Sequence, residues 1–339
     1  MTTERERRMT IQATALGPDY RLERGESSQR APAAGEVLIG NAATGLNHID
    51  LLASRAEMPP GLQPQEPFVA GVEGAGVVQS VGSDVSDVQP GDRVMWFGDL
   101  GVGGLSSSVL VESHQVVAID DSIDIEQAAA LPVAYTTALH MLGNLAEVPE
   151  NGWVFVHAGG GGVGLALVEL ATALGLQVIA TDVSDKRDAI TAAGAEVFVD
   201  HRTEDLAEAV RSATAGRGLS LSLNAVGGQS LARDFDLLAP FGTVILYGFL
   251  SGLPETTIAE TMVPFFDKSI ALRVSDIYTL SRANPALFKK TLARVARYAS
   301  DGQVRPRVRR FDDAREAFAA MEAKTHIGKL VIGTSAWQT

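Results

Sequence analysis

A glycine-rich turn between an apolar strand and an apolar helix is the part of this sequence whose chemistry is easiest to name. Residues 153–164 read WVFVHAGGGGVG, so Gly159, Gly161 and Gly164 have the spacing G-x-G-x-x-G. Backbone N–H groups without neighbouring side chains can approach a phosphate closely, and the N-terminus of the following helix carries a partial positive charge. The pattern predicts a dinucleotide site, and its alternative is a tight strand–helix connection that binds nothing.

A carboxylate at the end of the next apolar run bears on which dinucleotide would bind. Asp182 follows Gly164 by 18 residues in the segment ATDVSDKR. An acid at this position accepts a hydrogen bond from the ribose 2′-OH of NADH and repels the 2′-phosphate of NADPH, so Asp182 favours NADH. Ser184, Lys186 and Arg187 could instead hold a 2′-phosphate, which leaves the choice of cofactor open.

The elements that must position these residues change in character near residue 125. Before it, short apolar strands alternate with turn residues such as Pro90 and Gly91, at spacings typical of an all-β unit. After it, helical stretches alternate with short apolar strands. This β–α–β order predicts an α/β fold in which helices cover both faces of a parallel sheet, a doubly wound dinucleotide-binding fold.

The expected element and domain boundaries follow from these patterns. Helices are expected at about 126–145, 163–174, 185–193, 204–213 and 229–239, and strands at 153–158, 177–181, 196–199, 219–225 and 242–247. The tail should hold two more helices, joined through the basic run 305–310, and a strand at 328–333. We expect a loose arm at 1–8, a β-rich domain from 9–125 and 285–339, and a dinucleotide-binding domain at 126–284.

Composition excludes several classes of function. The 339 residues carry a net charge of −13, which argues against nucleic acid and anionic membranes as partners. The absence of cysteine excludes disulfides, thiolate zinc sites and cysteine nucleophiles. No apolar run reaches the length of a membrane span and the N-terminus has no apolar signal, so we expect a cytoplasmic protein.

Five short motifs occur in a fixed order along about 290 residues. They are GLNHID at 45–50, GVEGAGVV at 71–78, PGDRV at 90–94, HAGGGGVG at 157–164 and GKLVI at 328–332. Together they resemble the medium-chain dehydrogenase/reductase superfamily, and within it the zinc-independent quinone oxidoreductase branch. The resemblance implies a GroES-like β-rich catalytic domain, a Rossmann domain and a homodimer, for which the apolar segment 268–274 is a candidate edge strand.

The superfamily's zinc positions hold residues that cannot bind zinc. Zinc-dependent members have a cysteine where Asn47 stands, a histidine where Val72 stands and a third ligand near Val133. Without a Lewis acid, the resemblance implies hydride transfer from NADH or NADPH to an acceptor that is already electrophilic, a quinone or an α,β-unsaturated carbonyl. NADPH is the usual cofactor of the branch.

Two alternatives to this oxidoreductase stay open. One is a reductase or dehydrogenase dedicated to a single biosynthetic or lipid intermediate. The other is a non-catalytic NAD(P)H-binding or redox-sensing protein, which would not need the Asn47 segment; its presence favours an enzyme.

The resemblance also implies the catalytic residues. Asn47 is expected beside the nicotinamide, where its amide contacts the ribose or polarises a substrate carbonyl. Asp50 can share a helical face with Asn47 and is either catalytic or a helix cap. Many relatives have a tyrosine where Leu52 stands, so the proton donor is open, and Tyr135 and His48 are candidate replacements.

A further set of residues is expected to contact the cofactor because relatives use the matching positions. These are Thr137, Gly160, Gly162, Val163, Val183, His201, Val226, Gly248, Phe249, Leu250 and Lys329. Glu73 and His157 are interpreted as structural, the first within a glycine-rich strand and the second as a histidine of the core.

Overall fold

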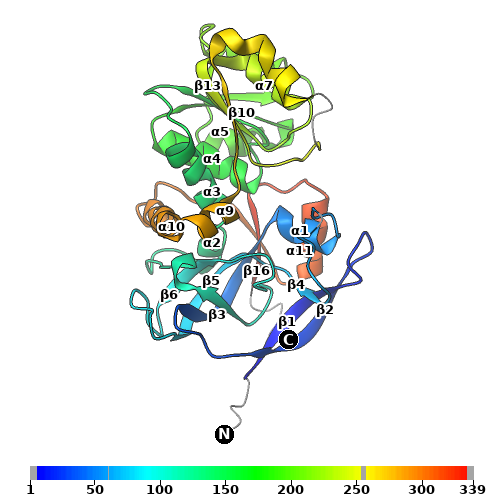
Figure 1. Cartoon of the computed structure of the whole chain (residues 1–339), viewed down its shortest axis with the longest axis vertical. Coiled ribbons are helices and arrows are strands. Elements are labelled where there is room, and N and C mark those ends of the chain that lie inside the picture. The colour runs from blue at the N-terminus through cyan, green and yellow to red at the C-terminus, as the bar shows by residue number, and fades with distance from the viewer. Residues whose placement is uncertain (1–5, 60, 253–256, 334–339) are drawn as a thin grey trace. The chain divides into compact units, whose positions relative to one another are not determined.

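The computed structural model describes residues 6–59, 61–252 and 257–333, and the chain divides into two compact units. Unit 1 combines Met1–Thr136 with Tyr278–Thr339, and unit 2 is Thr137–Ile277. Both ends of the chain, blue to cyan and orange to red in Figure 1, therefore belong to unit 1. The boundaries between the units lie within α3 (Ala134–His140) and within α9 (Ile277–Ala283). The sequence suggested boundaries after residues 125 and 284.

Unit 1 contains two sheets that are antiparallel except for one parallel pair. The smaller has the order β2-β1-β4, and the larger has the order β15-β16-β3-β5-β6-β8 with β7 also paired to β3. The strands are β1 (Glu6–Thr14), β2 (Arg21–Gln29), β3 (Glu36–Leu46), β4 (Phe68–Val69), β5 (Glu73–Val81), β6 (Arg93–Phe97), β7 (Ser108–Glu112), β8 (Val116–Ala118), β15 (Val308–Phe311) and β16 (Lys329–Gly333). The helices are α1 (His48–Ser54), η1 (Ser113–Gln115), α2 (Ile125–Ala129), α10 (Pro285–Ser300) and α11 (Ala314–Glu322), with most of α9.

The long strand β3 connects two hydrophobic cores of unit 1. Its first half places Val37 and Ile39 in one core with Trp96 of β6. Its last residue, Leu46, belongs to the other core, together with Phe318 of α11. Since β3 runs directly into α1, this strand fixes where the predicted active-site segment after residue 46 begins.

Two expectations for unit 1 are corrected by its strand pairing. Residues 6–8 are not part of a loose arm but begin β1, and the Arg8 Nε donates to Ser27 Oγ of β2 over 2.9 Å. The basic run 305–310 is not only a connection, because Val308–Phe311 forms β15 parallel to β16. Arginine side chains are compatible with β15 because it is an edge strand of its sheet: Arg309 and Arg310 are exposed while Phe311 is buried.

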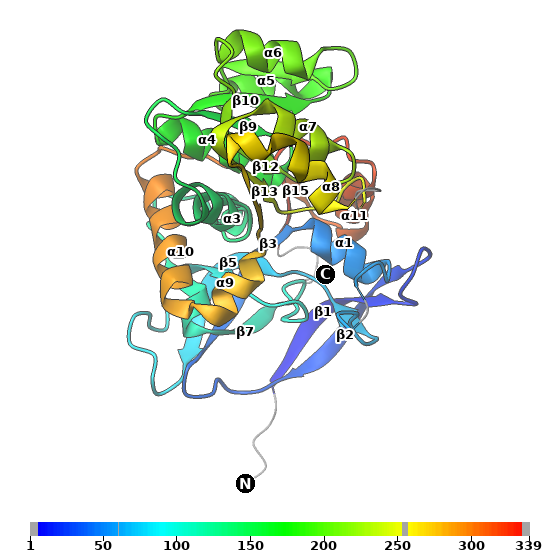
Figure 2. The same cartoon turned by 45° about the horizontal axis from the view of Figure 1, so that its top comes forward.

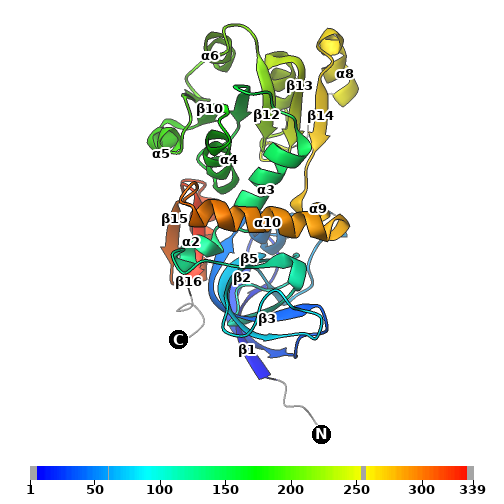
Figure 3. The same cartoon turned by 90° about the vertical axis from the view of Figure 1, so that its left-hand side faces the viewer.

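Unit 2 contains a six-stranded parallel sheet in the order β11-β10-β9-β12-β13-β14. Figure 2 labels β9, β10, β12 and β13 of this sheet, and Figure 3 labels β14 beside β13. Its strands are β9 (Trp153–Val156), β10 (Gln177–Asp182), β11 (Val197–Asp200), β12 (Leu219–Asn224), β13 (Leu238–Leu246) and β14 (Ala271–Val274). Its helices are η2 (Met141–Leu145), α4 (Gly162–Ala173), η3 (Ser184–Lys186), α5 (Arg187–Ala192), α6 (Leu206–Ala213), α7 (Ser230–Leu237), α8 (Ile258–Met262) and η4 (Val263–Lys268). The predicted doubly wound α/β fold is confirmed.

Helices cover both faces of this sheet because successive strand side chains point to opposite sides. Phe155 of β9 shares a core with Leu206 of α6 and Phe235 of α7. The buried leucines of α4 are absent from that core, although α4 contacts β9 and β10. Val154 and Val156, which point away from Phe155, therefore face the side of α4.

The helix expected at 126–145 is divided. Helix α2 ends at Ala129, α3 begins at Ala134, and the last turn is the π-helix η2. Pro132 explains the break, because proline has no N–H to donate and disfavours helical backbone in the residue before it. Within the part of the chain that the structure describes, no helix has the length and apolar character that crossing a bilayer requires.

Candidate functional site

The glycine turn connects β9 to α4 as predicted from its spacing. Ala158 opens the turn with a φ of +50°, and Gly161 N–H donates to the Ala158 carbonyl over 3.0 Å. Gly161 is the N-cap of α4, and no side chain caps this end of the helix. Because the first N–H groups of a helix have no partner within it, α4 offers donors to an anion at this end.

The space around each glycine tests whether a phosphate fits. A Cβ on Gly164 would stand 2.2 Å from the Ala158 carbonyl oxygen, so this glycine is required by the packing of the turn on its helix. A Cβ on Gly161 would meet nothing closer than the same oxygen at 3.4 Å. The protein's own packing does not need a glycine at 161, and the room it leaves at an uncapped helix end fits a cofactor pyrophosphate.

Asp182 ends β10 and is bound into the glycine turn. Its Oδ2 accepts the Gly160 N–H over 3.0 Å, and its Oδ1 accepts the Val183 N–H over 2.8 Å. The ammonium of Lys186 lies 3.5 Å from Oδ1. Each carboxylate oxygen can accept a second hydrogen bond, so Asp182 can still receive a ribose hydroxyl while it holds the turn.

The other candidate groups for a 2′-phosphate have partners elsewhere. The backbone N–H of Ser184 donates to Asp200 Oδ2 over 3.1 Å, and its hydroxyl donates to the same oxygen. Arg187 pairs with Glu204 at 2.9 Å. Of these candidates, only Lys186 has a side chain against the Asp182 carboxylate. The predicted His201 follows β11 with an exposed side chain, and its backbone N–H donates to the Asp182 carbonyl over 3.2 Å.

The turns after β12 and β13 are joined into one surface, which we call the platform and define as residues 225–228 and 248–252. Ser251 N–H donates to the Val226 carbonyl over 2.8 Å, and Leu250 N–H donates to the Ala225 carbonyl over 3.1 Å. A Cβ on Gly248 would stand 2.7 Å from the Ala225 carbonyl oxygen, so a glycine is required there. The predicted cofactor contacts Val226, Gly248, Phe249 and Leu250 are thus brought together where two parallel strands end.

In unit 1, Asn47 belongs to a buried polar cluster with Glu73 and Lys329, which are 9%, 0% and 5% exposed. The Lys329 ammonium lies 2.6 Å from Glu73 Oε1 and 2.7 Å from Asn47 Oδ1, and donates to the Leu46 carbonyl over 2.8 Å. Asn47 Nδ2 donates to Glu73 Oε1 over 2.8 Å. The three ammonium protons therefore have acceptors inside unit 1, through which Lys329 orients Asn47. The cofactor contact predicted for Lys329 stays a prediction.

Glu73 is the residue of this cluster that the sequence placed outside the site. Its Oε2 accepts the Val133 N–H over 2.6 Å, and its Oε1 is shared by Asn47 and Lys329. A Cβ on Gly45 would stand 2.6 Å from Glu73 Oε1, so this glycine makes room for the carboxylate. The signal for its role was an acid among glycines in an otherwise apolar strand.

The carboxylate of Asp50 accepts hydrogen bonds from two backbone N–H groups. Its Oδ2 accepts the Asn47 N–H over 2.9 Å and its Oδ1 accepts the Gly71 N–H over 2.7 Å. Burial raises the pKa of Asp50 to about 7, while these two hydrogen bonds favour its charged form. Asp50 is 0% exposed, and both of its oxygens accept backbone N–H groups, which fits the capping alternative. A catalytic role for Asp50 stays a prediction.

The candidates Tyr135 and Thr137 lie in α3 and are 1% and 8% exposed, whereas His48 is exposed at the start of α1. Their predicted roles beside substrate and cofactor stay predictions. Val72 and Val133 offer no metal-binding atom in their side chains, and among residues 6–59, 61–252 and 257–333 no three His, Asp or Glu side chains gather as a metal site would require.

Two family models match the chain in the order of its domains. The alcohol dehydrogenase GroES-like domain matches residues 33–121, and the zinc-binding dehydrogenase domain matches residues 162–297. This chain is a medium-chain dehydrogenase/reductase. The predicted superfamily and its quinone-oxidoreductase-like branch are confirmed, and so is the predicted fold with a GroES-like and a Rossmann domain.

Individual relatives of this dehydrogenase/reductase include two kinds of reductase. The Escherichia coli quinone oxidoreductase complexed with NADPH is 25% identical with a TM-score of 0.84, and the alignment covers 96% of this chain and 99% of that one. The CurK enoyl reductase is 27% identical with a TM-score of 0.83 over the same shares.

Most of the curated relatives are polyketide synthases, which are much longer proteins. The highly reducing polyketide synthase ZEA2 of Gibberella zeae is 34% identical over 307 residues, which are 88% of this chain and 12% of the synthase. Across seven polyketide synthases that it matches, the chain spans between 8% and 18% of their length.

Proposed function

We propose that this chain is an NAD(P)H-dependent reductase that transfers a hydride, without zinc, to a quinone or an α,β-unsaturated carbonyl. The observation that carries the proposal is the cluster of Asn47, Glu73 and Lys329. Where zinc-dependent members have a metal ligand, this chain has an amide held in one orientation by a lysine and a carboxylate. Asn47 Oδ1 accepts one hydrogen bond and has capacity for a second, which suits a hydroxyl donor such as a ribose.

The cofactor supplies the hydride, and the chain's residues bind and orient it. The glycine turn and the first N–H groups of α4 would hold the pyrophosphate of the cofactor. Asp182 and Lys186 would lie at its adenosine ribose. The platform would contact the parts of the cofactor on either side of the pyrophosphate. The related quinone oxidoreductase that is complexed with NADPH supports the assignment of a nicotinamide cofactor.

The acceptor is tested by the loss of absorbance at 340 nm, with NADH and NADPH supplied separately. We expect turnover with a simple quinone, because a quinone reduced by hydride can take its proton from water and Leu52 leaves no family tyrosine to donate one. Turnover should persist after treatment with a chelator. Cofactor binding without turnover of either a quinone or an enone would instead favour the non-catalytic alternative.

A dedicated enoyl reductase is the second candidate, favoured by the similarity to polyketide synthases and to the CurK enoyl reductase. Reduction of an enoyl thioester needs a proton at the α carbon as well as a hydride. The same assay with a crotonyl thioester distinguishes the two, since a kcat/KM above that for the quinone would assign the chain to enoyl reduction.

Cofactor preference depends on the charge of Asp182. Asp182→Asn keeps an oxygen for the Gly160 N–H but removes the charge that repels a 2′-phosphate. We expect the ratio of kcat/KM for NADPH to that for NADH to rise about tenfold, equivalent to about 1.4 kcal/mol. Asp185→Asn, an exposed acid in the next turn, is the matched control. An unchanged ratio in Asp182→Asn would show that this carboxylate does not select the cofactor.

The homodimer is also part of this proposal. Strand β14 is the edge of the parallel sheet of unit 2 and pairs with β13 on one side, as its apolar sequence suggested. Val274 at its end is 64% exposed. An exposed strand edge with an apolar side chain is suited to pairing with a second copy. A small-molecule acceptor as the other partner and the cytoplasmic location stay predictions.

A further inference from the structure

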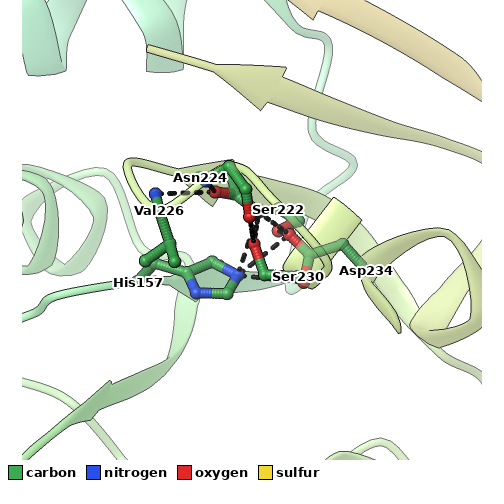
Figure 4. A network of polar contacts seen from close by, with 7 residues as sticks. His157, Ser222, Asn224, Val226, Ser230 and Asp234 are labelled. Carbon is green, nitrogen blue, oxygen red and sulfur yellow. Dashed lines mark hydrogen bonds and ion pairs between the residues drawn. The ribbon is translucent and has the colours of Figure 1, made fainter. Parts of the chain in front are cut away.

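A buried carboxylate on α7, Asp234, collects hydrogen bonds from two strands (Figure 4). The Ser222 hydroxyl and the Asn224 Nδ2 of β12 donate to Asp234 Oδ2 over 2.7 and 2.6 Å. His157, directly after β9, places Nε2 2.9 Å from both carboxylate oxygens. Asp234 has no exposed surface, so it contacts neither cofactor nor substrate.

The side-chain amide of Asn224 has a donor end, Nδ2, and an acceptor end, Oδ1, and both ends are hydrogen-bonded. Its Oδ1 accepts the N–H groups of Val226 and Gly227, each over 2.8 Å. Its Nδ2 donates to Asp234, as well as to Ser230 Oγ over 2.9 Å. An acceptor at residue 234 therefore keeps the nitrogen inward and the oxygen toward the turn, because the reversed amide would set an oxygen against a carboxylate.

The turn that Asn224 holds is the first half of the platform. Gly227 and Gly228 have φ of +67° and +53°, in the left-handed region. Because glycine can adopt many other backbone conformations as well, hydrogen bonds from neighbouring residues are needed to hold this turn in one conformation. Gly228 N–H in turn donates to the Gly252 carbonyl over 2.9 Å. At the other end of the network, His157 precedes Ala158, the residue that opens the glycine turn. One buried carboxylate thus supports both turns assigned to the cofactor.

We propose that Asp234 is a positioning residue of the cofactor site, which fixes the orientation of the Asn224 amide and through it the shape of the platform. The proposal rests on the proposed function only for the identity of the ligand. The hydrogen-bond polarity on which it depends is a property of the free protein.

The test exchanges the two polar partners. Asn224→Asp sets a second carboxylate against Asp234, and we expect the dissociation constant for NADPH to rise about tenfold or more, as for a buried polar pair that loses its complementarity. In the double variant Asn224→Asp/Asp234→Asn, the amide and carboxylate have changed places, so the hydrogen bond is restored with its direction reversed. We expect this variant to bind NADPH within about threefold of the unaltered protein. Binding is measured by NADPH fluorescence.

Two controls separate polarity from simple disruption. Ser222→Ala removes one donor to Asp234 but leaves Asn224 in place, and should bind NADPH nearly as the unaltered protein does. Asp234→Asn alone gives the background for the double variant, and its defect should be smaller than that of Asn224→Asp, because it sets no two carboxylates against each other and the new amide still offers an oxygen to Asn224 Nδ2. A double variant that binds no better than Asn224→Asp would overturn the proposal.

Hydrogen exchange of the Val226 and Gly227 amides gives a readout without any cofactor. We expect exchange to quicken in Asn224→Asp and to slow again in the double variant. This result stands even if the unaltered protein binds no NADPH, an outcome that would contradict the proposed function alone. Unchanged exchange in Asn224→Asp would contradict the role of Asp234. If Asn224→Asp does not fold, recovery of the fold by Asp234→Asn still tests the polarity.

Discussion

Replacing Gly161 by alanine should weaken cofactor binding strongly and leave the fold intact. The backbone of Gly161 has a φ of −77°, which alanine adopts without strain, and the new Cβ would lie 3.4 Å from its nearest neighbour, the Ala158 oxygen. The methyl group would occupy the room left at the uncapped end of α4, where the pyrophosphate is proposed to sit. We expect the KM for NADPH to rise about 100-fold, equivalent to about 2.8 kcal/mol, and the midpoint of urea unfolding to stay unchanged.

Gly164→Ala is the matched comparison within the same motif. Its Cβ would stand 2.2 Å from the Ala158 oxygen and 2.8 Å from the Gly159 Cα, both backbone atoms that cannot move aside cheaply. This variant should therefore lose stability as well as binding. If Gly161→Ala instead unfolds at lower urea while binding NADPH normally, the turn is only a tight connection between strand and helix.

These two glycines also show what the sequence could predict. The cofactor turn is contiguous, since strand, turn and helix follow one another and the spacing of the glycines reports local geometry directly. The position of Asp182 was equally predictable from the sequence, because the end of the second parallel strand lies beside the first turn in this fold. The pairing of β9 with β10 and the hydrogen bond from Gly160 to Asp182 agree with that expectation.

The parts that the sequence did not predict depend on contacts between distant residues. Glu73 and Lys329 are separated by 256 positions and meet because β16 pairs with β3, which in turn pairs with β5. Asp234 lies on an amphipathic helix where an acid ordinarily faces solvent, and only the packing of α7 on β12 buries it. The periodicity of apolar residues predicts which face of a helix or strand is buried, but it does not predict which polar side chains are buried with that face.

The largest effect on stability is expected from Lys329→Met. Methionine fills a similar volume but supplies no charge, so the Glu73 carboxylate, which has no exposed surface, would lose its ammonium partner. Removing one member of a buried ion pair costs about 3–5 kcal/mol, because the other charge stays buried and unpaired. We expect urea unfolding to show a loss of that size, and Lys290→Met, at an exposed position, to show almost none.

Adding Glu73→Gln to Lys329→Met separates the charge from the packing. With both charges removed, the glutamine oxygen can accept the Val133 N–H, and its nitrogen can donate to an Asn47 amide that no longer meets a lysine. The double variant should recover at least half of the lost stability, since a buried ion pair contributes little beyond its neutral replacement. It should nevertheless reduce quinones more slowly than the unaltered protein, because the amide of Asn47 would then be turned by 180° and present nitrogen where the ribose hydroxyl needs an acceptor. Full activity in the double variant would show that the orientation of Asn47 has no part in the reaction.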